Sequence, residues 1–293
     1  HKSIIKNYWN CPSCGALLSK TPTKNGKAVK AERVWESKFD IELNKIIRQA
    51  KQSPVLIIYT VGKKTFEKIP DKLDLELIKN IDESNILHPF SLIELPDGFN
   101  THQPKKSHGF THTHHFFSHR NFWALSSIQE KFQNNSFTHQ LNFIITSFLI
   151  KRGSKLHNIG FRDGGLNLAG AVPNTLFIPS VIAERNIPDL ALAKLKSLMI
   201  VFEIIKHQST CLIEAESASN PIYNPKNYVD YIFIDPPFGG NLMYSELNFL
   251  WETWLRVFTN NQPEAVINTV QHKGLYEYQT LMQACFDEFY RVL

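Results

Sequence analysis

A short apolar run that stops at two consecutive prolines restricts the fold of this chain more than any other feature. Residues 228–234 read Tyr-Val-Asp-Tyr-Ile-Phe-Ile and predict a β-strand, and the unbroken apolar end predicts burial on both faces, as in a parallel sheet. Pro236 and Pro237 remove two backbone donors and end the strand. A helix is expected next, with Ser245 as its N-cap and apolar residues at helical spacing: Leu247, Leu250, Trp251, Trp254 and Leu255. The order of strand, turn and helix predicts an α/β fold with a ligand site where the strand ends.

The turn between this strand and this helix offers an unusual set of acceptors. The Asp235 carboxylate and the Pro236 carbonyl can both accept hydrogen bonds, and Phe238 adds a flat apolar ring beside them. Such a set suits an amino group on a flat heterocycle. The acceptors bind the two amino hydrogens while the ring stacks on the base.

One stretch, residues 230–251, resembles the catalytic segment of amino-group DNA methyltransferases. More narrowly, the chain resembles a family of large bacterial DNA methylases with a zinc-ribbon insert. Four further segments are similar to that family in the same order: the Cys-Pro-Ser-Cys-Gly knuckle at 11–15 with Val-Trp-Glu at 34–36, Phe-Phe-Ser-His-Arg-Asn at 116–121, Glu-Ala-Val-Ile at 264–267, and Glu-Phe-Tyr-Arg-Val-Leu at 288–293.

The resemblance implies an enzyme that transfers a methyl group from S-adenosyl-L-methionine to an exocyclic amino group of a DNA base, with adenine-N6 favoured over cytosine-N4. It assigns the catalytic role to Asp235, Pro236, Pro237 and Phe238, which would hold the flipped base. It assigns substrate contacts to Gly239, Asn241, Tyr244 and Ser245, with Glu246 beside them. Two alternatives stay open: Ser245 is only a helix cap, and Asn241 only relieves the turn.

The chain departs from the family in three places, one of which is the missing second cysteine pair of the ribbon. The glycine-rich cofactor loop is absent, because no Gly-x-Gly occurs anywhere, so the residues that bind the cofactor are unknown. The Lys-Pro-Gly expected after the terminal Arg-Val-Leu is also missing. We therefore expect an internal fragment, inactive by itself if its strand lacks sheet neighbours. Two other functions stay open: a tRNA or RNA guanine-amino methyltransferase, and an inactive, truncated remnant that still binds DNA.

The expected fold is α/β, with part of a Rossmann-like methyltransferase fold at the C-terminal end, a helical insert and a small N-terminal zinc-ribbon-like element. The predicted segments are a ribbon-like element at 1–45, a mixed insert and loop at 46–117, a helical insert with target recognition at 118–224, and the catalytic half at 225–293. Within them we expect a strand at 55–59, a helix at 72–80, and a loop or linker at 96–115.

Three helices are predicted in the insert and one at the end of the chain. The first is capped by Ser118, with Phe122, Leu125, Ile128 and Phe132 inside, and the second by Ser136, with Leu141, Ile144, Ile145 and Phe148 inside. The third starts at Pro188 and runs to about His207, with an apolar face of Leu192, Leu195, Met199, Phe202 and Ile205. The last spans about 276–291 and uses Leu281, Met282, Cys285, Phe289 and Val292.

Cys11 and Cys14 form half of a zinc knuckle, in which Gly15 permits the tight turn. No second pair follows, since Cys211 and Cys285 are distant and isolated, so the pattern leaves open zinc or a ribbon turn that persists without metal. A His-rich stretch contains a His-x-His at 112 and 114 but no close carboxylates, which favours a flexible loop over a metal site.

The amino-acid composition limits the classes of partner that the chain can bind. Net charge is +5, which permits a polyanion such as DNA without requiring one. The candidate phosphate contacts are Lys105, Lys106, Arg120, Lys151, Arg152 and Lys155, against the alternative of a solvated surface. No apolar run spans a membrane and no signal segment is seen, so we expect a cytoplasmic protein, with restriction or phage-defence subunits as further candidate partners.

Overall fold

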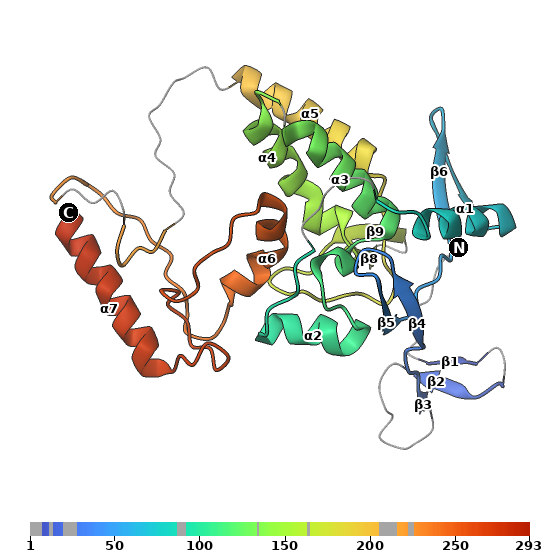
Figure 1. Cartoon of the computed structure of the whole chain (residues 1–293), viewed down its shortest axis with the longest axis horizontal. Helices are drawn as coiled ribbons and strands as arrows, with labels where there is room; N and C mark the ends of the chain where they lie inside the picture. Colours follow the sequence, from blue (N-terminus) through green and yellow to red (C-terminus); the bar gives the residue numbers. More distant parts are fainter. Residues whose placement is uncertain are drawn as a thin grey trace. The chain divides into compact units, whose positions relative to one another are not determined.

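The computed structural model describes residues 8–11, 14–19, 28–86, 92–133, 135–162, 165–204, 216–221 and 226–293 (Figure 1). The chain divides into two compact units. The smaller unit comprises His1–Asn85, Ser107–Gly109 and Ile159–Ala169, and the larger comprises Ile86–Lys106, Phe110–Asn158 and Gly170–Leu293. Among the described residues, no helix combines the length and the apolar composition that crossing a bilayer requires.

The smaller unit is built from short strands. β1 (Tyr8–Asn10) pairs antiparallel with β2 (Leu17–Ser19), and β2 pairs parallel with β3 (Val29–Lys30). Two antiparallel hairpins follow, β4 (Trp35–Asp40) with β5 (Lys45–Ala50) and β6 (Ile57–Val61) with β7 (Lys64–Lys68). A further two-stranded sheet joins β8 (Asn158–Arg162) to β9 (Gly165–Gly170). The strand predicted at 55–59 thus forms two residues later.

Helix α1 (Lys72–Asp82) confirms the helix predicted at 72–80. Its start is fixed by a reciprocal cap. The Asp71 side chain accepts from the Asp74 backbone N–H at 3.0 Å, and the Asp74 side chain accepts from the Asp71 N–H at 2.9 Å. Such a capping box satisfies two amide donors that the first turn leaves without helical partners.

The larger unit is mainly helical. It contains α2 (Phe99–His108), the 3₁₀ turn η1 (Thr113–Phe116), α3 (His119–Gln133), α4 (Thr138–Phe148), the π-helical turn η2 (Leu149–Gly153), α5 (Ile187–Ile204), α6 (Tyr244–Leu255) and α7 (Leu275–Val292). Helices α3, α4 and α5 contact one another in pairs and run side by side (Figure 1). The expected loop at 96–115 is therefore wrong, because α2 and η1 occupy most of it. Pro104 lies inside α2, so neither proline nor a polar composition prevented a helix there.

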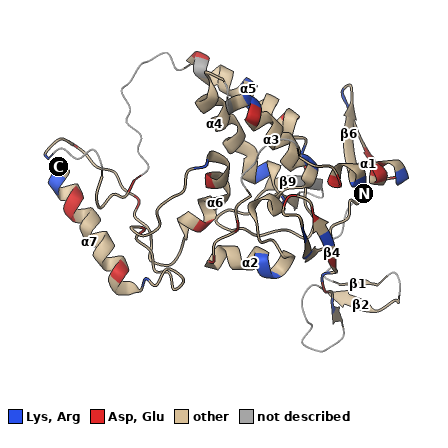
Figure 2. Cartoon of the chain, in the orientation of Figure 1, with Lys and Arg blue, Asp and Glu red and all other residues tan. Residues whose placement is uncertain are grey.

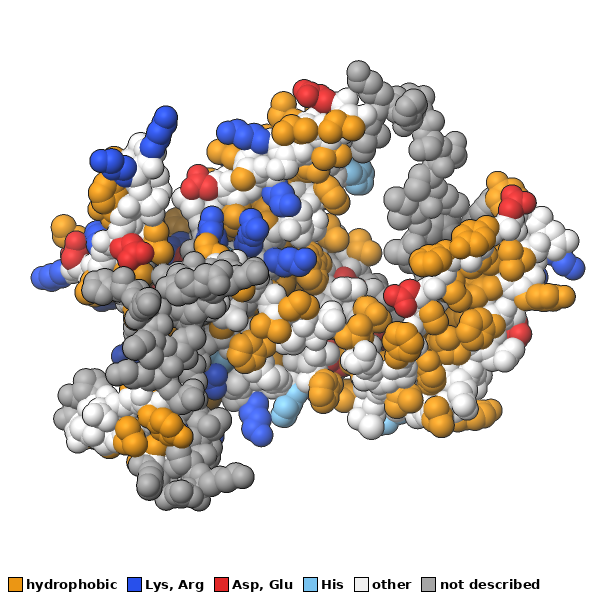
Figure 3. Space-filling model, turned by 180° about the vertical axis from the view of Figure 1, so that it is seen from behind, with side chains coloured by type: hydrophobic (Ala, Val, Ile, Leu, Met, Phe, Trp, Pro, Cys, Tyr) orange, Lys and Arg blue, Asp and Glu red, His pale blue; other side chains and the backbone are white. Residues whose placement is uncertain are grey.

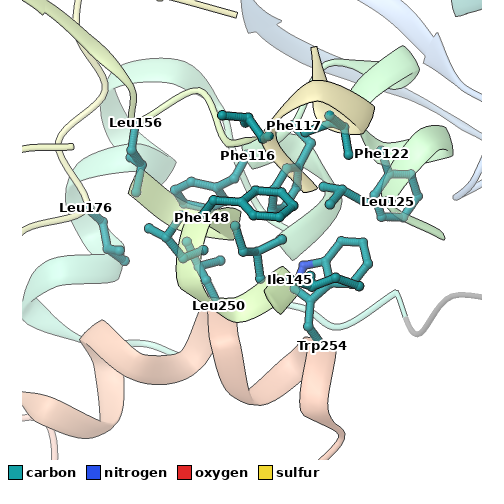
Figure 4. Close-up of a cluster of buried hydrophobic side chains, with 14 of the residues drawn as sticks. Phe116, Phe117, Phe122, Leu125, Ile145, Phe148, Leu156, Leu176, Leu250 and Trp254 are labelled. Carbon is teal, nitrogen blue, oxygen red and sulfur yellow. The ribbon is translucent and has the colours of Figure 1, made fainter. Parts of the chain in front are cut away.

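The core of the larger unit joins α3, α4, η2 and α6. Phe122 and Leu125 of α3, and Ile145 and Phe148 of α4, are buried as predicted. Trp254 of α6 packs edge-on against Phe117 and Phe122, with ring centroids 5.6 and 6.0 Å apart, and Figure 4 shows its ring beside Ile145. Burying one such side chain contributes about 1.5–3 kcal/mol relative to leaving it exposed.

Two helix starts differ in how well the sequence predicted them. Ser118 caps α3 as expected, since its hydroxyl accepts from the Asn121 N–H at 3.3 Å. The cap predicted at Ser136 is wrong, because α4 begins after Phe137 and no side chain caps it.

The buried face of α5 also differs from the prediction. Ile187 and Leu190 are buried, whereas Leu192, Leu195 and Met199 are exposed. Helix α5 carries apolar side chains nearly all round, so helical spacing alone could not decide which side faces α3 and α4. The predicted continuation over Ile205–His207 lies outside the described residues, as do the Phe202 side chain and Cys211.

The predicted strand at 228–234 is wrong. Residues 226–243 contain no helix or strand, and Phe233 is 83% exposed. A strand needs a neighbour for its backbone groups, and here the N–H groups of Tyr228 and Val229 instead donate to the Val292 carbonyl at the end of α7, at 2.8 and 3.0 Å. In the described chain, the parallel pairing is limited to β2 with β3. The fold is thus mixed α/β, and a Rossmann-like sheet stays a prediction.

Candidate active site

The turn after the expected strand is held by backbone contacts on both sides. Gly239 has a φ of +55°, a left-handed conformation that glycine adopts readily. The Asn241 N–H donates to the Phe238 carbonyl at 3.1 Å and closes the turn. The Ile267 N–H donates to the Gly239 carbonyl at 3.2 Å, and a Cβ on Gly240 would lie 3.1 Å from the Ile267 oxygen. A side chain at Gly239 or Gly240 would therefore crowd the loop around Ile267, and at Gly239 it would also strain the backbone.

Helix α7 holds the same turn from another side. The Tyr278 hydroxyl donates to the Pro237 carbonyl at 2.7 Å. Because neither proline has an amide hydrogen, Pro237 can join a hydrogen-bond network only through this oxygen. The bond therefore fixes the peptide that connects Pro237 to Phe238. Tyr278 was not predicted, since its position in the apolar helix pattern gives no sign of this role.

The side chains around the turn are open to solvent. Asp235 and Asn241 are exposed, Phe238 is 73% exposed, and Tyr244, the first residue of α6, is 47% exposed. Pro236 and Pro237 are half-buried. The turn therefore presents a carboxylate and two aromatic rings on a backbone fixed by other elements. These groups can accept hydrogen bonds and stack on a planar ligand.

Ser245 is tied to a polar network and is not the cap of α6, which begins after Met243 without a side-chain cap. The Ser245 N–H and hydroxyl both donate to the Glu264 carboxylate, at 3.1 and 2.7 Å. Gln271 donates to the same carboxylate at 3.1 Å. Glu264 thus supplies the negative charge that a helix N-terminus favours, from outside the helix. The resemblance placed Glu264 in a similar segment but predicted no contact for it.

A buried lysine supports this network. The Lys273 ammonium donates to the carbonyl oxygens of Asn261 and Glu264, at 2.6 and 2.7 Å. Burial lowers the pKa of Lys273, and the Glu264 charge partly opposes this. Asn268 and Lys273 also exchange backbone hydrogen bonds of 2.9 Å. Lys273 therefore closes the loop that reaches Gly239, a role that no sequence spacing indicated.

Glu246 is buried and faces α2. Its carboxylate accepts from the Asn100 N–H at 2.7 Å and from the Asn268 amide at 3.3 Å. A Cβ added to Gly98 would lie 2.4 Å from the Glu246 Cδ, so only glycine permits this approach. Glu246 is thus a cap for α2, and its expected place in the base pocket has no support here.

The cysteine pair lies in the smaller unit. Cys11 and Cys14 flank the turn between β1 and β2, where the Gly15 N–H donates to the Cys11 carbonyl at 2.8 Å and Gly15 has a φ of +73°. The two residues between the cysteines lie outside the described part. Within that part, neither cysteine joins a set of three ligand-bearing side chains. The described residues thus offer half of a closed zinc site, and a bound zinc ion stays a prediction.

The His-rich stretch is ordered around a turn, which contradicts the flexible loop expected there. His114 and His115 are buried, with ring centroids 4.2 Å apart. The His115 Nδ1 accepts from the N–H groups of Thr111 and His112, at 3.0 and 3.3 Å. This nitrogen stabilises the turn, so His115 could not bind a metal ion through Nδ1.

Two of the predicted phosphate contacts lie in ion pairs. Lys105 pairs with Asp97 at 2.8 Å, and Arg120 pairs with Glu184. Lys155 lies over the Phe110 ring, 5.0 Å from its centroid.

Comparison of the chain with protein-family models, with curated proteins and with solved structures finds no match in any of the three.

Proposed function

We propose that the chain is the base-holding part of a DNA methyltransferase that acts on the exocyclic amino group of adenine. The observation that carries this proposal is the turn at Asp235–Phe238, which combines exposed side chains with a fixed backbone. Its Pro237 and Gly239 carbonyls are bound by α7 and by the loop at Ile267. A preorganised turn binds a flipped base at a smaller entropic cost than a mobile one.

Each group of the turn has a defined task in this proposal. The Asp235 carboxylate and the Pro236 carbonyl accept the two amino hydrogens and so orient the lone pair of the nitrogen. Phe238 stacks on the base and offsets part of the few kcal/mol that base extrusion costs. Tyr244 is exposed at the start of α6 and would contact the base or its sugar. Attack by the oriented nitrogen is then mainly a matter of position.

The apolar stretch before the turn supports a Rossmann-like sheet as part of the proposal. Figure 3 shows many exposed hydrophobic side chains in the C-terminal part, and Tyr231, Phe233, Tyr276 and Tyr290 are all largely exposed. Exposed apolar area of this extent favours a covering partner.

In this proposal, the described residues suit the base but not the cofactor S-adenosyl-L-methionine. The chain has no Gly-x-Gly, the element that lets a backbone approach such a cofactor closely. When bound, this cofactor would supply the methyl group, and the residues here only position its acceptor. We therefore assign no cofactor-binding residue in this chain.

Binding of single-stranded oligonucleotides tests the proposal without requiring methyl transfer. An oligodeoxyadenylate should bind more tightly than the same oligomer with purine, which lacks the amino group, in place of each adenine. This difference should be lost in Asp235→Ala and kept in the matched control Asp230→Ala, an exposed carboxylate five residues earlier. Tighter binding of a guanine-containing RNA oligomer would support the RNA enzyme instead. Equal affinities for the adenine and purine oligomers would overturn the base-holding turn and leave the DNA-binding remnant.

A further inference from the structure

We propose that Lys151, Arg152 and Arg185 form a surface that binds the phosphate backbone of duplex DNA. We call these three residues the basic surface. The inference rests on the proposed function for the choice of DNA, but its evidence is independent of the turn at Asp235. In Figure 2 the ribbon is blue just after α4 ends, where Lys151 and Arg152 lie in η2.

The turn η2 is anchored on its inner side and open on its outer side. Leu149, Ile150 and Gly153 are buried, whereas Lys151 and Arg152 are exposed. The Gly153 carbonyl accepts from the buried Asn121 amide at 3.2 Å. The Ser154 hydroxyl donates to the Ile150 carbonyl at 2.7 Å. The two cations therefore extend from a rigid backbone. π-helical turns inside or after α-helices are frequent at functional sites.

The buried residue His157 anchors the loop that carries the third cation, Arg185. The His157 Nδ1 donates to the Ala183 carbonyl at 2.7 Å, because that oxygen can only accept, and the Ala183 N–H donates to the His157 carbonyl at 3.0 Å. This pairing fixes the loop that carries Arg185, two residues after Ala183. Burial is the main cause of the lowered pKa of His157, and the nearby charges of Arg185 and Arg152 lower it further. Both guanidinium groups thus act electrostatically on the same buried ring.

Within the described part of the chain, the charges of the basic surface are not neutralised by a carboxylate. Glu184 is the acidic neighbour of Arg185, but its carboxylate binds Arg120 and accepts from the Ser118 hydroxyl at 2.7 Å. Among the described residues, no carboxylate forms an ion pair with Lys151, Arg152 or Arg185. Three cations on an anchored backbone, without a carboxylate partner among the described residues, favour a ligand with several negative charges.

The chemistry of these side chains indicates phosphodiesters. Arginine guanidinium groups bind phosphate oxygens in a bidentate geometry, and lysine adds a flexible point charge. Contacts of this kind fix the position of a duplex without reading its sequence. The basic surface would thus hold the DNA backbone while other residues select the base.

Salt-dependent DNA binding tests this inference. Binding of the full chain to a 20-base-pair duplex without methyl donor is measured by fluorescence anisotropy over a range of salt concentrations. The triple variant Lys151→Gln, Arg152→Gln, Arg185→Gln should reduce the magnitude of the slope of log K against log salt by about 2–3, since each phosphate contact contributes about 0.9. The control variant Lys63→Gln, Lys64→Gln, Lys196→Gln removes the same charge from exposed sites elsewhere and should leave the slope unchanged.

Equal slopes for the two triple variants would overturn the inference, as would failure of the unaltered chain to bind the duplex at low salt. Tighter binding of tRNA than of duplex would overturn the assignment to DNA. Circular dichroism spectra and urea midpoints of both variants verify that they fold. Asp235→Ala is measured in parallel and should keep the full slope. A chain that shows the predicted slopes but binds the adenine and purine oligomers equally would contradict only the proposed function.

Discussion

The Tyr278 hydroxyl and the Pro237 carbonyl form a 2.7 Å hydrogen bond that joins α7 to the turn 41 residues earlier in the chain. Pro237 has no amide hydrogen, so its backbone can only accept. Tyr278 is half-buried and lies on α7, a helix with no buried residue. This contact therefore holds together two parts that share little core.

Replacing Tyr278 with Phe removes only the hydroxyl and should lower the free energy of unfolding by about 0.5–1.5 kcal/mol, the usual net value of one hydrogen bond. Tyr276→Phe is the matched control, because Tyr276 lies in the same helix, is 76% exposed and should have no effect. Urea denaturation measures both variants. Equal midpoints for the two would show that the bond does not stabilise the fold.

The Ser245 and Glu264 side chains should act as one unit. Glu264→Ala removes both acceptors of Ser245 and the charge near the start of α6, so we expect a loss of about 1–3 kcal/mol. Ser245→Ala should cost less, because Gln271 still binds Glu264. A double-mutant cycle in urea should give a coupling energy of about 0.5–3 kcal/mol. Additive effects would show that the two residues do not stabilise each other.

Gly98→Ala should be strongly destabilising, by about 1–3 kcal/mol, because the new Cβ meets the buried Glu246 carboxylate. That carboxylate cannot move away without losing its bond to the Asn100 N–H. In a Glu246→Ala background the obstacle is gone, so the same change should cost much less. Thermal unfolding of the four proteins tests this. The explanation fails if Gly98→Ala is equally costly in both backgrounds.

His157 should make stability depend on pH. Its pKa is lowered in the folded state, so below about pH 6.5 the unfolded chain binds a proton that the folded chain does not. This contribution to stability is complete above the unfolded pKa and is lost as the pH falls toward the folded pKa. His157→Asn can keep the bond to Ala183 without titrating. Urea midpoints at pH 7.5 and 5.5 should therefore differ less for this variant than for the unaltered chain, and an equal difference would contradict the prediction.

Helices were predictable where apolar spacing and a cap agreed. Residues 72–82 and 119–133 have both signals, and 275–292 has a single apolar stripe whose members are half-buried, as at Leu281, Met282 and Cys285. The buried side of α6 was also predicted for Leu250 and Trp254, although Leu255 is exposed. Local interactions decide these helices, and such interactions are visible in the sequence.

The sequence was less informative where distant residues decide the outcome. Residues 228–234 have the composition of a buried strand, but a strand forms only with partners, and here the N–H groups of Tyr228 and Val229 donate to α7. In the candidate site, the acceptors and the ring at Asp235–Phe238 were predicted from local chemistry, and their role in holding a base stays a prediction. The residues that hold this turn, Tyr278 and Lys273, come from 30 or more residues later, and their contacts depend on how the helices pack.

The π-helical turn η2 makes the direction of Lys151 and Arg152 depend on chain length. A π turn amounts to one residue inserted into an α-helix, and each residue of an α-helix turns the chain by about 100°. Deleting a single residue from this turn would let α4 continue as a regular helix and rotate both cations by roughly a quarter of a circle. A change of one codon could therefore redirect two positive charges without altering either side chain.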